Sequence, residues 1–194
     1  NLQKSFNMNY RPAKFSYLPE VVKNLLIING LFFLATYVLS SSLNIDIIKY
    51  LGLHQFQSEN FRPHQLITHL FMHGSLGHIF FNMFALWMFG NQLENIWGSK
   101  RFLTYFMITG LGAAALHIGI NQLEIFQLST GSPQLIELAK KGLYQQGDPN
   151  SLQITKLIST PTVGASGAVF GLLLAFGMLF PNTLIYIYFA IPIK

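Results

Sequence analysis

The side chains best suited to chemistry are one serine and two polar residues near the starts of apolar segments. Ser166 lies within Gly164-Ala165-Ser166-Gly167, where an apolar run that reaches Phe180 begins. The flanking glycines leave space around its hydroxyl, and a polar residue inside a membrane segment is by default a functional-site hypothesis. His78 and Asn82 stand four residues apart in another apolar segment, so they share one helix face. A serine nucleophile with imidazole and amide donors is what acyl transfer requires.

Apolar segments near the length that crosses a bilayer, about 20 residues, must position these side chains. The sequence predicts five: Leu25–Leu39, Leu76–Gln92, Phe102–Ile120, Gly164–Phe180, and a fifth from Pro181-Asn182 to the chain end. The second and fourth then run in the same direction, so their first turns lie at one membrane face. Ser75 is the expected N-cap of the second. We therefore expect Ser166, His78 and Asn82 at comparable depth below that face, where two helix N-termini offer unpaired N–H groups.

The composition is that of a membrane protein. Hydrophobic residues make up 51% of the 194 residues and charged residues 10%, and the mean hydropathy is +0.40, whereas soluble domains carry about 25% charged residues. The absence of cysteine excludes disulfides and thiol catalysis. The net charge of +5 comes from scattered basic residues, so no nucleic-acid partner is expected. No cofactor motif is present, and no cofactor is expected.

The charged residues predict an orientation. Residues 1–23 carry a net charge of +3 and the turn around Lys100 and Arg101 carries +1, whereas the two loops at the opposite face each sum to zero. The positive-inside rule then places the N-terminus in the cytoplasm. We accordingly divide the chain into a cytoplasmic segment, 1–23, and a membrane domain, 24–194.

The connections between the spans are expected to be mostly irregular. Ser40–Gln65 is predicted as an interfacial loop with short amphipathic pieces. Asn121–Pro161 is polar and is predicted to hold one short helix near Gln134–Lys141. Glu94, at the end of the second span, is expected to be structural, either capping backbone N–H groups or pairing with Arg101.

Each polar residue also has a plainer interpretation. Gly167 and Gly171 have the small-xxx-small spacing of close helix packing, and Ser166 alone would fit that role. His69, His73 and His78 could suggest a metal, but the glutamate of a zinc-protease HExxH is missing, so no metal is expected. His117 is expected to be a satisfied structural group. Lys156 as a Ser/Lys-type base is a minor alternative.

Three stretches resemble the rhomboid intramembrane serine proteases. Gly164–Gly167 matches the family's GxSG motif, and His73–Asn82 looks like its HxxxN signature with the preceding histidine. Gly90–Glu94 followed by Gly98–Phe102 is similar to the turn after the second span. Many members carry a Trp-Arg pair where this chain has His64-Gln65. The resemblance implies an all-α polytopic helical bundle, with five of an expected six spans present.

The resemblance also implies roles. Ser166 would attack the peptide carbonyl, while His78, Asn82 and the Ser166 backbone N–H would hold the oxyanion. The family's base is a histidine on the sixth span, which none of the six histidines here matches, so it is expected beyond Lys194. The implied partners are transmembrane protein substrates, cleaved near the outer face, and membrane lipid. The expected location is a bacterial inner membrane, and nothing indicates an oligomeric state.

Two rival functions belong to other classes. One is a non-catalytic rhomboid-like membrane protein that binds transmembrane clients, and the retention of Ser166, His78 and Asn82 together argues against it. The other is a small transporter or channel subunit, which would require ionisable residues in mid-span, where the chain has almost none.

Overall fold

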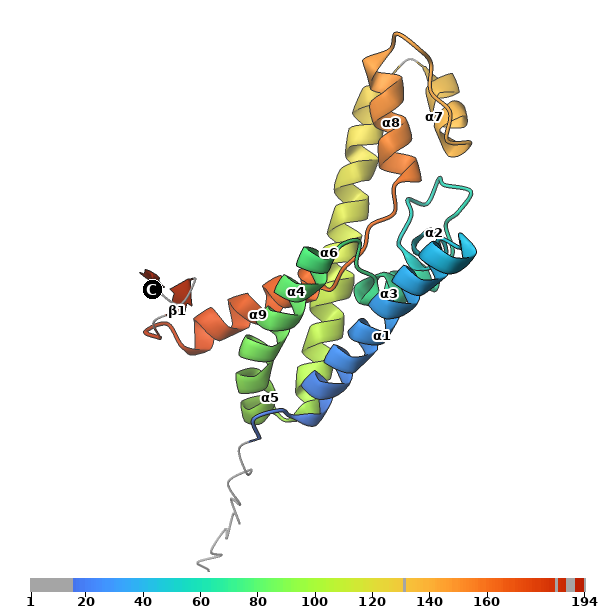
Figure 1. Cartoon of the computed structure of the whole chain (residues 1–194). Coiled ribbons are helices and arrows are strands. Elements are labelled where there is room, and N and C mark those ends of the chain that lie inside the picture. The colour runs from blue at the N-terminus through green and yellow to red at the C-terminus, as the bar shows by residue number, and fades with distance from the viewer. Residues whose placement is uncertain (1–15, 131, 184, 188–190, 194) are drawn as a thin grey trace, which may run out of the picture.

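The computed structural model describes residues 16–130, 132–183, 185–187 and 191–193, and their structure is dominated by helices (Figure 1). The long helical segments are α1 (Glu20–Leu43), α4 (Leu76–Ala85) continued by the π turn η2 (Leu86–Gly90) and α5 (Asn91–Trp97), α6 (Ser99–Leu128) and α9 (Ser166–Leu179). The shorter elements are α2 (Ile47–Leu51), α3 (Gln65–Thr68), the 3-10 turn η1 (His69–Phe71), α7 (Pro133–Lys140), α8 (Pro149–Ser159), β1 (Ile185–Ile187) and β2 (Ile191–Ile193).

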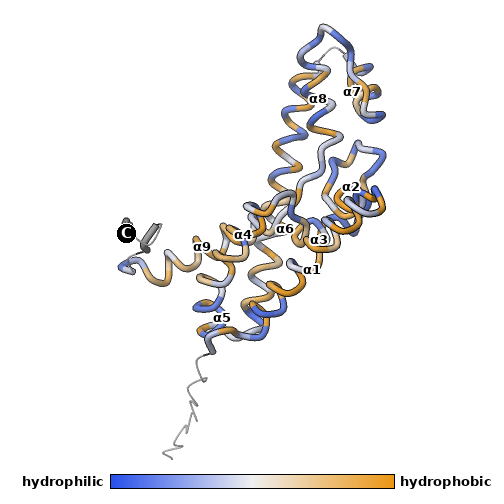
Figure 2. The backbone as a smooth tube through the Cα atoms, in the orientation of Figure 1, coloured by the Kyte–Doolittle hydropathy of each residue, from blue (hydrophilic) through white to orange (hydrophobic). Residues whose placement is uncertain are grey.

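Helices α1 and α6 are long and apolar enough to cross a membrane, whereas α9, at 14 residues, is apolar but shorter. Figure 2 shows the hydrophobic residues concentrated on α1, α4, α9 and the first half of α6. With 30 residues at 1.5 Å each, α6 is about 45 Å long and exceeds the roughly 30 Å hydrocarbon core. Its C-terminal turns therefore extend beyond the other spans, further than the predicted end at Ile120.

The start of α1 is fastened to the end of α5 by a buried carboxylate. Glu94 accepts hydrogen bonds from the backbone N–H groups of Val21 and Val22, at 3.0 and 2.8 Å, and from the Ser99 hydroxyl at 2.6 Å. The capping role predicted for Glu94 is confirmed, and the alternative pairing with Arg101 is not seen. These contacts define one end of the bundle, here named the Glu94 face, which carries the start of α1 and the α5–α6 turn.

The opposite end, here named the Ser166 face, carries the starts of α4 and α9. Ser75 accepts a hydrogen bond from the His78 N–H at 3.2 Å, which confirms the predicted N-cap of α4. Helices α6 and α9 cross closely through small residues. A Cβ added to Gly167 would lie 2.5 Å from the Ala113 Cβ, and one added to Gly171 would lie 2.6 Å from the Thr109 Cβ.

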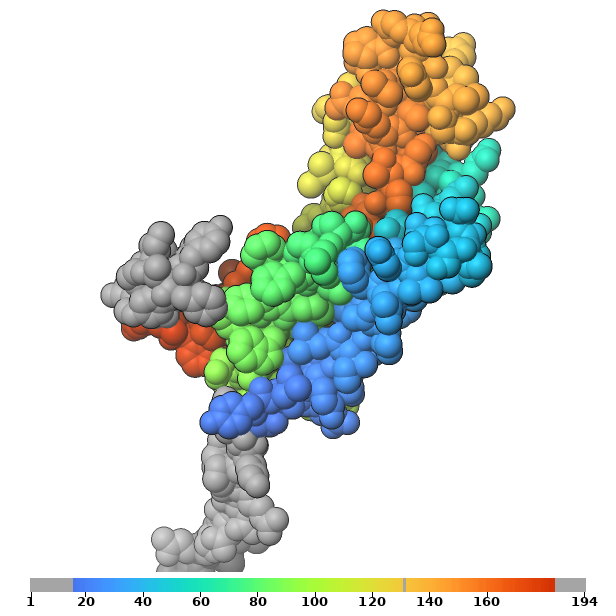
Figure 3. Space-filling view, viewed as in Figure 1, coloured from blue at the N-terminus to red at the C-terminus, as the bar shows by residue number. Residues whose placement is uncertain are grey.

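The connection between α6 and α9 is more ordered than the sequence predicted. Its short helix is confirmed as α7, but the remainder is not a loop, because α6 continues to Leu128 and α8 forms a second helix. Asp148 caps α8 by accepting from the N–H groups of Asn150 and Ser151, and Pro149 occupies its first turn. The hydrophobic core of this α7–α8 module consists of Leu135, Ala139, Ile154 and Ile158, packed with Ile125 of α6. The module projects as a lobe beyond the Ser166 face (Figures 1 and 3).

The predicted fifth span is wrong for the part of it that the structure describes. Ile185–Ile187 and Ile191–Ile193 form an antiparallel pair, with Ile185 opposite Ile193. The stretch alternates β-branched and aromatic residues, which favour strands, and Pro192 would interrupt a helix. Residues 184, 188–190 and 194 of the predicted span lie outside the described residues, as do residues 1–15 of the predicted cytoplasmic segment. Helix α1 begins at Glu20, inside that segment.

Candidate active site

Backbone hydrogen bonds hold the segment that leads into Ser166. Leu53 and Thr162 exchange two of them, at 2.9 and 2.8 Å, and the Gly164 N–H donates to the His69 carbonyl at 2.9 Å. The loop between α1 and α4 thus fixes residues 162–164 from one side. Ser166 follows as the first residue of α9 and is partly buried.

On its other side this segment contacts the polar residues of α4. A Cβ added to Gly164 would lie 2.7 Å from both Cε1 and Nε2 of His78, and 3.7 Å from Nδ2 of Asn82. Gly164 also has a φ of +120°, a conformation that side chains other than glycine rarely adopt. Position 164 therefore requires glycine for two reasons, and it is the point where the GxSG motif contacts the α4 residues.

Asn82 has an unused hydrogen-bond donor. Its side chain is 6% exposed, and its Nδ2 is buried with no partner among the described residues. A buried amide that donates no hydrogen bond is costly in a folded protein, and each such group calls for an explanation. This unpaired donor, close to the segment that carries Ser166, is chemically suited to stabilise a negatively charged oxygen.

Ser166 lines a cavity of about 200 Å³ that lies between α6, α9 and the η1 turn. The polar residues around it are His69, His117, Thr162 and Ser166 itself, and Phe170 and Ala113 supply apolar wall. Ala113 lies about 21 Å along α6 from Ser99, which puts the level of Ser166 well away from the Glu94 face. The cavity lining does not include His78 or Asn82, which contact Gly164 instead.

His117, on α6, lines the cavity that also contains Ser166. Its Nε2 pairs with the Asn121 amide at 3.2 Å, which agrees with the predicted structural role, but the residue is exposed and lines the same cavity as the serine. The sequence could have indicated the position of His117 near the serine through its spacing from Ala113. His117 is one helical turn beyond Ala113, which touches Gly167.

The histidine that precedes the HxxxN signature is buried beside it. His73 is 1% exposed, and its ring lies edge-on to that of His78 with centroids 4.9 Å apart. Burial, with a smaller contribution from His78, lowers the pKa of His73 from its usual 6.5 to about 4. His73 is therefore neutral at physiological pH. The described residues contain no group of three metal-ligating side chains.

The loop between α1 and α4 is organised around Gln65, a role that the sequence did not reveal. Gln65 is fully buried, and its amide oxygen accepts from the N–H groups of His54 and Arg62, at 3.4 and 3.1 Å. Its amide nitrogen donates to the carbonyls of Tyr50 and Asn60, at 3.2 and 2.9 Å. Gln65 therefore supports the loop that positions residues 162–164.

Comparison with known families identifies the family of the protein. The Rhomboid domain model matches residues 60–193, more than half of the chain, and the protein belongs to the rhomboid family. It is an integral membrane protein with the helical fold of that family.

Curated relatives carry the same family name. The chain is 28% identical over 174 residues, 90% of its length, to RHOMBOID-like protein 12, mitochondrial, of Arabidopsis thaliana. It is 29% identical over 128 residues, 66% of its length, to Rhomboid protein 1, mitochondrial, of Saccharomyces cerevisiae. These alignments cover 46% and 28% of the two relatives, so the chain spans less than half of the length of either. Both names are mitochondrial, and they do not support the bacterial inner membrane that we expected.

Proposed function

We propose that this protein is an intramembrane serine endopeptidase that cleaves transmembrane protein substrates near the Ser166 face. The observation that carries the proposal is the close approach of Gly164, two residues before Ser166, to His78, with the unpaired amide of Asn82 nearby. Membership of the rhomboid family supports it.

In the proposed mechanism, the Ser166 hydroxyl oxygen attacks the scissile carbonyl and gives up its proton to a histidine base. The carbonyl oxygen becomes an oxyanion, which accepts hydrogen bonds from Asn82, His78 and the free N–H groups in the first turn of α9. The base returns the proton to the leaving amine, and water then hydrolyses the acyl-enzyme. The family resemblance implies a histidine as this base, and none of the six histidines in this sequence matches it.

The surroundings of Ser166 are suited to hydrolysis and to local unwinding of a substrate. A cavity with four polar lining residues below the Ser166 face can admit water. A helical substrate hides its carbonyls in backbone hydrogen bonds, so it must unwind before Ser166 can attack. We therefore expect substrates whose helices are weakened by small or helix-breaking residues at the cleavage site.

The orientation is part of the proposal. We infer that the Glu94 face is cytoplasmic, or its equivalent in an organelle, because the segments at that face carry the net positive charge. The hydrogen bonds that Glu94 accepts from the N–H groups at the start of α1 support the placement of these two segments at one face.

The test uses the full-length protein and a transmembrane substrate. Replacement of Asn82 by Ala should lower kcat by about 10²–10³-fold, because an oxyanion donor is lost. Asn150→Ala, which removes an exposed amide at the start of α8, should leave kcat unchanged. Unfolding of both variants is measured in parallel, so that loss of fold is distinguished from loss of catalysis.

A fluorophosphonate should label the wild-type protein and fail to label Ser166→Ala. Labelling that persists in Ser166→Ala would remove the serine from the mechanism. An Asn82→Ala protein that folds and turns over normally would remove Asn82 from the oxyanion site. A protein that is not labelled, cleaves nothing and yet captures transmembrane segments would instead be the non-catalytic client-binding relative.

A further inference from the structure

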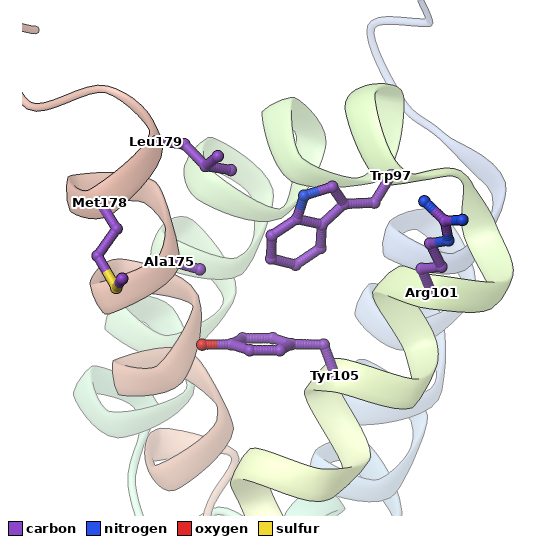
Figure 4. Close-up of a pocket in the computed structure, with 6 residues that line it drawn as sticks. All are labelled: Trp97, Arg101, Tyr105, Ala175, Met178 and Leu179. Carbon is purple, nitrogen blue, oxygen red and sulfur yellow. The ribbon is translucent and has the colours of Figure 1, made fainter.

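A second cavity lies at the Glu94 face, at the other end of the bundle from Ser166. It has a volume of about 420 Å³ and lies between the α5–α6 turn and the last turns of α9 (Figure 4). Trp97, Arg101 and Tyr105 line one side, and Ala175, Met178 and Leu179 line the other. None of these residues has a part in the proposed proteolysis.

The wall of this cavity is apolar and held in place. The Tyr105 hydroxyl donates to the Gly171 carbonyl at 2.9 Å, so its ring bridges α6 and α9. The Trp97 ring packs edge-on against it, with centroids 5.1 Å apart. On α9, Met178 and Leu179 are 75% and 46% exposed, so they offer apolar surface to a molecule in the cavity. Trp and Tyr are typical of the boundary between lipid tails and headgroups.

One cation stands at this cavity without a carboxylate partner. Arg101 is exposed and forms no ion pair with the described residues. The neighbouring carboxylate, Glu94, is 3% exposed and is engaged by Val21, Val22 and Ser99. Figure 4 shows the guanidinium directed toward the α5–α6 turn, which is the end of the bundle that meets the membrane surface. Its positive charge is therefore available to an anion at headgroup level.

We propose that this cavity binds one anionic phospholipid. The phosphate would accept hydrogen bonds from Arg101, and an acyl chain would lie against Met178, Leu179 and the two aromatic rings. A lipid supplies both parts of this chemistry, a headgroup anion and an apolar chain, whereas a free phosphate has nothing to fill the apolar wall. Basic pockets between membrane helices at the cytoplasmic or matrix side are known sites for anionic lipid headgroups.

The experiment is native mass spectrometry of the full-length protein with phosphatidylglycerol or phosphatidylcholine. We expect one retained lipid, with phosphatidylglycerol favoured about fivefold over phosphatidylcholine, the preference that one basic residue supplies. Arg101→Gln should remove this preference. Met178→Trp, which places a large ring in the cavity from an exposed position, should reduce retention of both lipids.

The matched control is Lys100→Gln, which removes the same charge from the adjacent residue outside the cavity lining. It should preserve the preference to within about twofold, because Lys100 does not line the cavity. A general attraction to a charged surface would instead make the two variants lose the preference equally. The proposal is overturned if Arg101→Gln keeps the preference, if Lys100→Gln loses it equally, or if Met178→Trp retains lipid as the wild type does. Because binding is measured without turnover, these outcomes are independent of the protease proposal.

Discussion

The two halves of α6 are packed by opposite means. In the membrane half, Gly167 and Gly171 of α9 approach so closely that a single added Cβ would meet Ala113 or Thr109 within 2.7 Å. In the half that projects beyond the Ser166 face, Ile125 packs against large buried side chains of α7 and α8. Alanine is thus too large for the α9 positions that cross the membrane half of α6, and too small for the positions that pack against its other half.

The physical reason lies in the solvent around each half. Lipid tails are as apolar as leucine, so helices in a membrane gain little from burying large side chains and associate through close backbone contact. The α7–α8 module projects from the span set, where burial of Ile154 and Ile158 removes apolar surface from water. The crossing of α6 and α9 positions Ser166, whereas the module adds surface beside it.

The largest effect should follow from Ile158→Ala in the α7–α8 module. This side chain is fully buried, and its truncation should destabilise the module by about 2–5 kcal/mol. Hydrogen exchange should show faster exchange of the α7 and α8 amides and unchanged exchange in α9. Faster exchange throughout α9 would mean that the two regions unfold as one unit, which would contradict the comparison.

Gly167→Ala should come next, at a cost of about 1–3 kcal/mol from overpacking. Its Cβ would lie 2.5 Å from that of Ala113, so the helices must separate. The measurement is thermal unfolding in detergent. Adding Ala113→Gly removes the collision, and the double variant should be more stable than the two single changes predict when summed. Simple additivity would show that this contact does not determine the crossing.

Asp148→Ala should have a smaller effect and act on the module alone. It removes the N-cap of α8, which accepts from the N–H groups of Asn150 and Ser151, for a loss of about 1 kcal/mol. Amide exchange in α8 should accelerate, and Asp148→Asn should restore most of the protection because asparagine also caps helices. An equal loss in both variants would assign the effect to charge rather than to capping.

Near neutral pH, acidification should change the stability of the protein less than any of the substitutions above. His73 has a folded-state pKa of about 4 against an ordinary value of 6.5, so the unfolded chain binds a proton that the folded protein does not. Stability should therefore be constant above about pH 6.5 and fall as the pH drops from there to about 4. Urea unfolding in detergent across this range tests the expectation.

The loss on acidification should be smaller in His73→Gln and unchanged in His64→Gln, which alters an exposed histidine. Part of the loss should remain in His73→Gln, because burial also lowers the pKa of His54 and His69 in the same loop. An identical pH dependence of stability with and without His73 would show that this residue does not cause the loss of stability on acidification.

Much of the fold could be predicted from local sequence signals. Ser75 at the start of α4 and the apolar runs of α1 and α6 follow from cap chemistry and hydropathy, which depend on neighbouring residues. Helix α8 carried such a signal too, since Asp148-Pro149 precedes Ile154 and Ile158, but a generally polar composition concealed it. At residues 185–187 and 191–193 the apolar composition predicted a helical span, but the residues form strands. β-branched residue type, which favours strands, was the better indicator there.

The sequence by itself determined which segments are apolar, where α4 begins, and which side chains could act as nucleophile and oxyanion donors, because these properties depend on residue type and short spacings. Only the tertiary structure decided that Gly164 contacts His78, that Gln65 supports the loop beneath it, and that Glu94 caps α1 and so leaves Arg101 unpaired. Those contacts join residues between about 5 and 85 positions apart in the chain. Packing in three dimensions, rather than local propensity, brings most of them together.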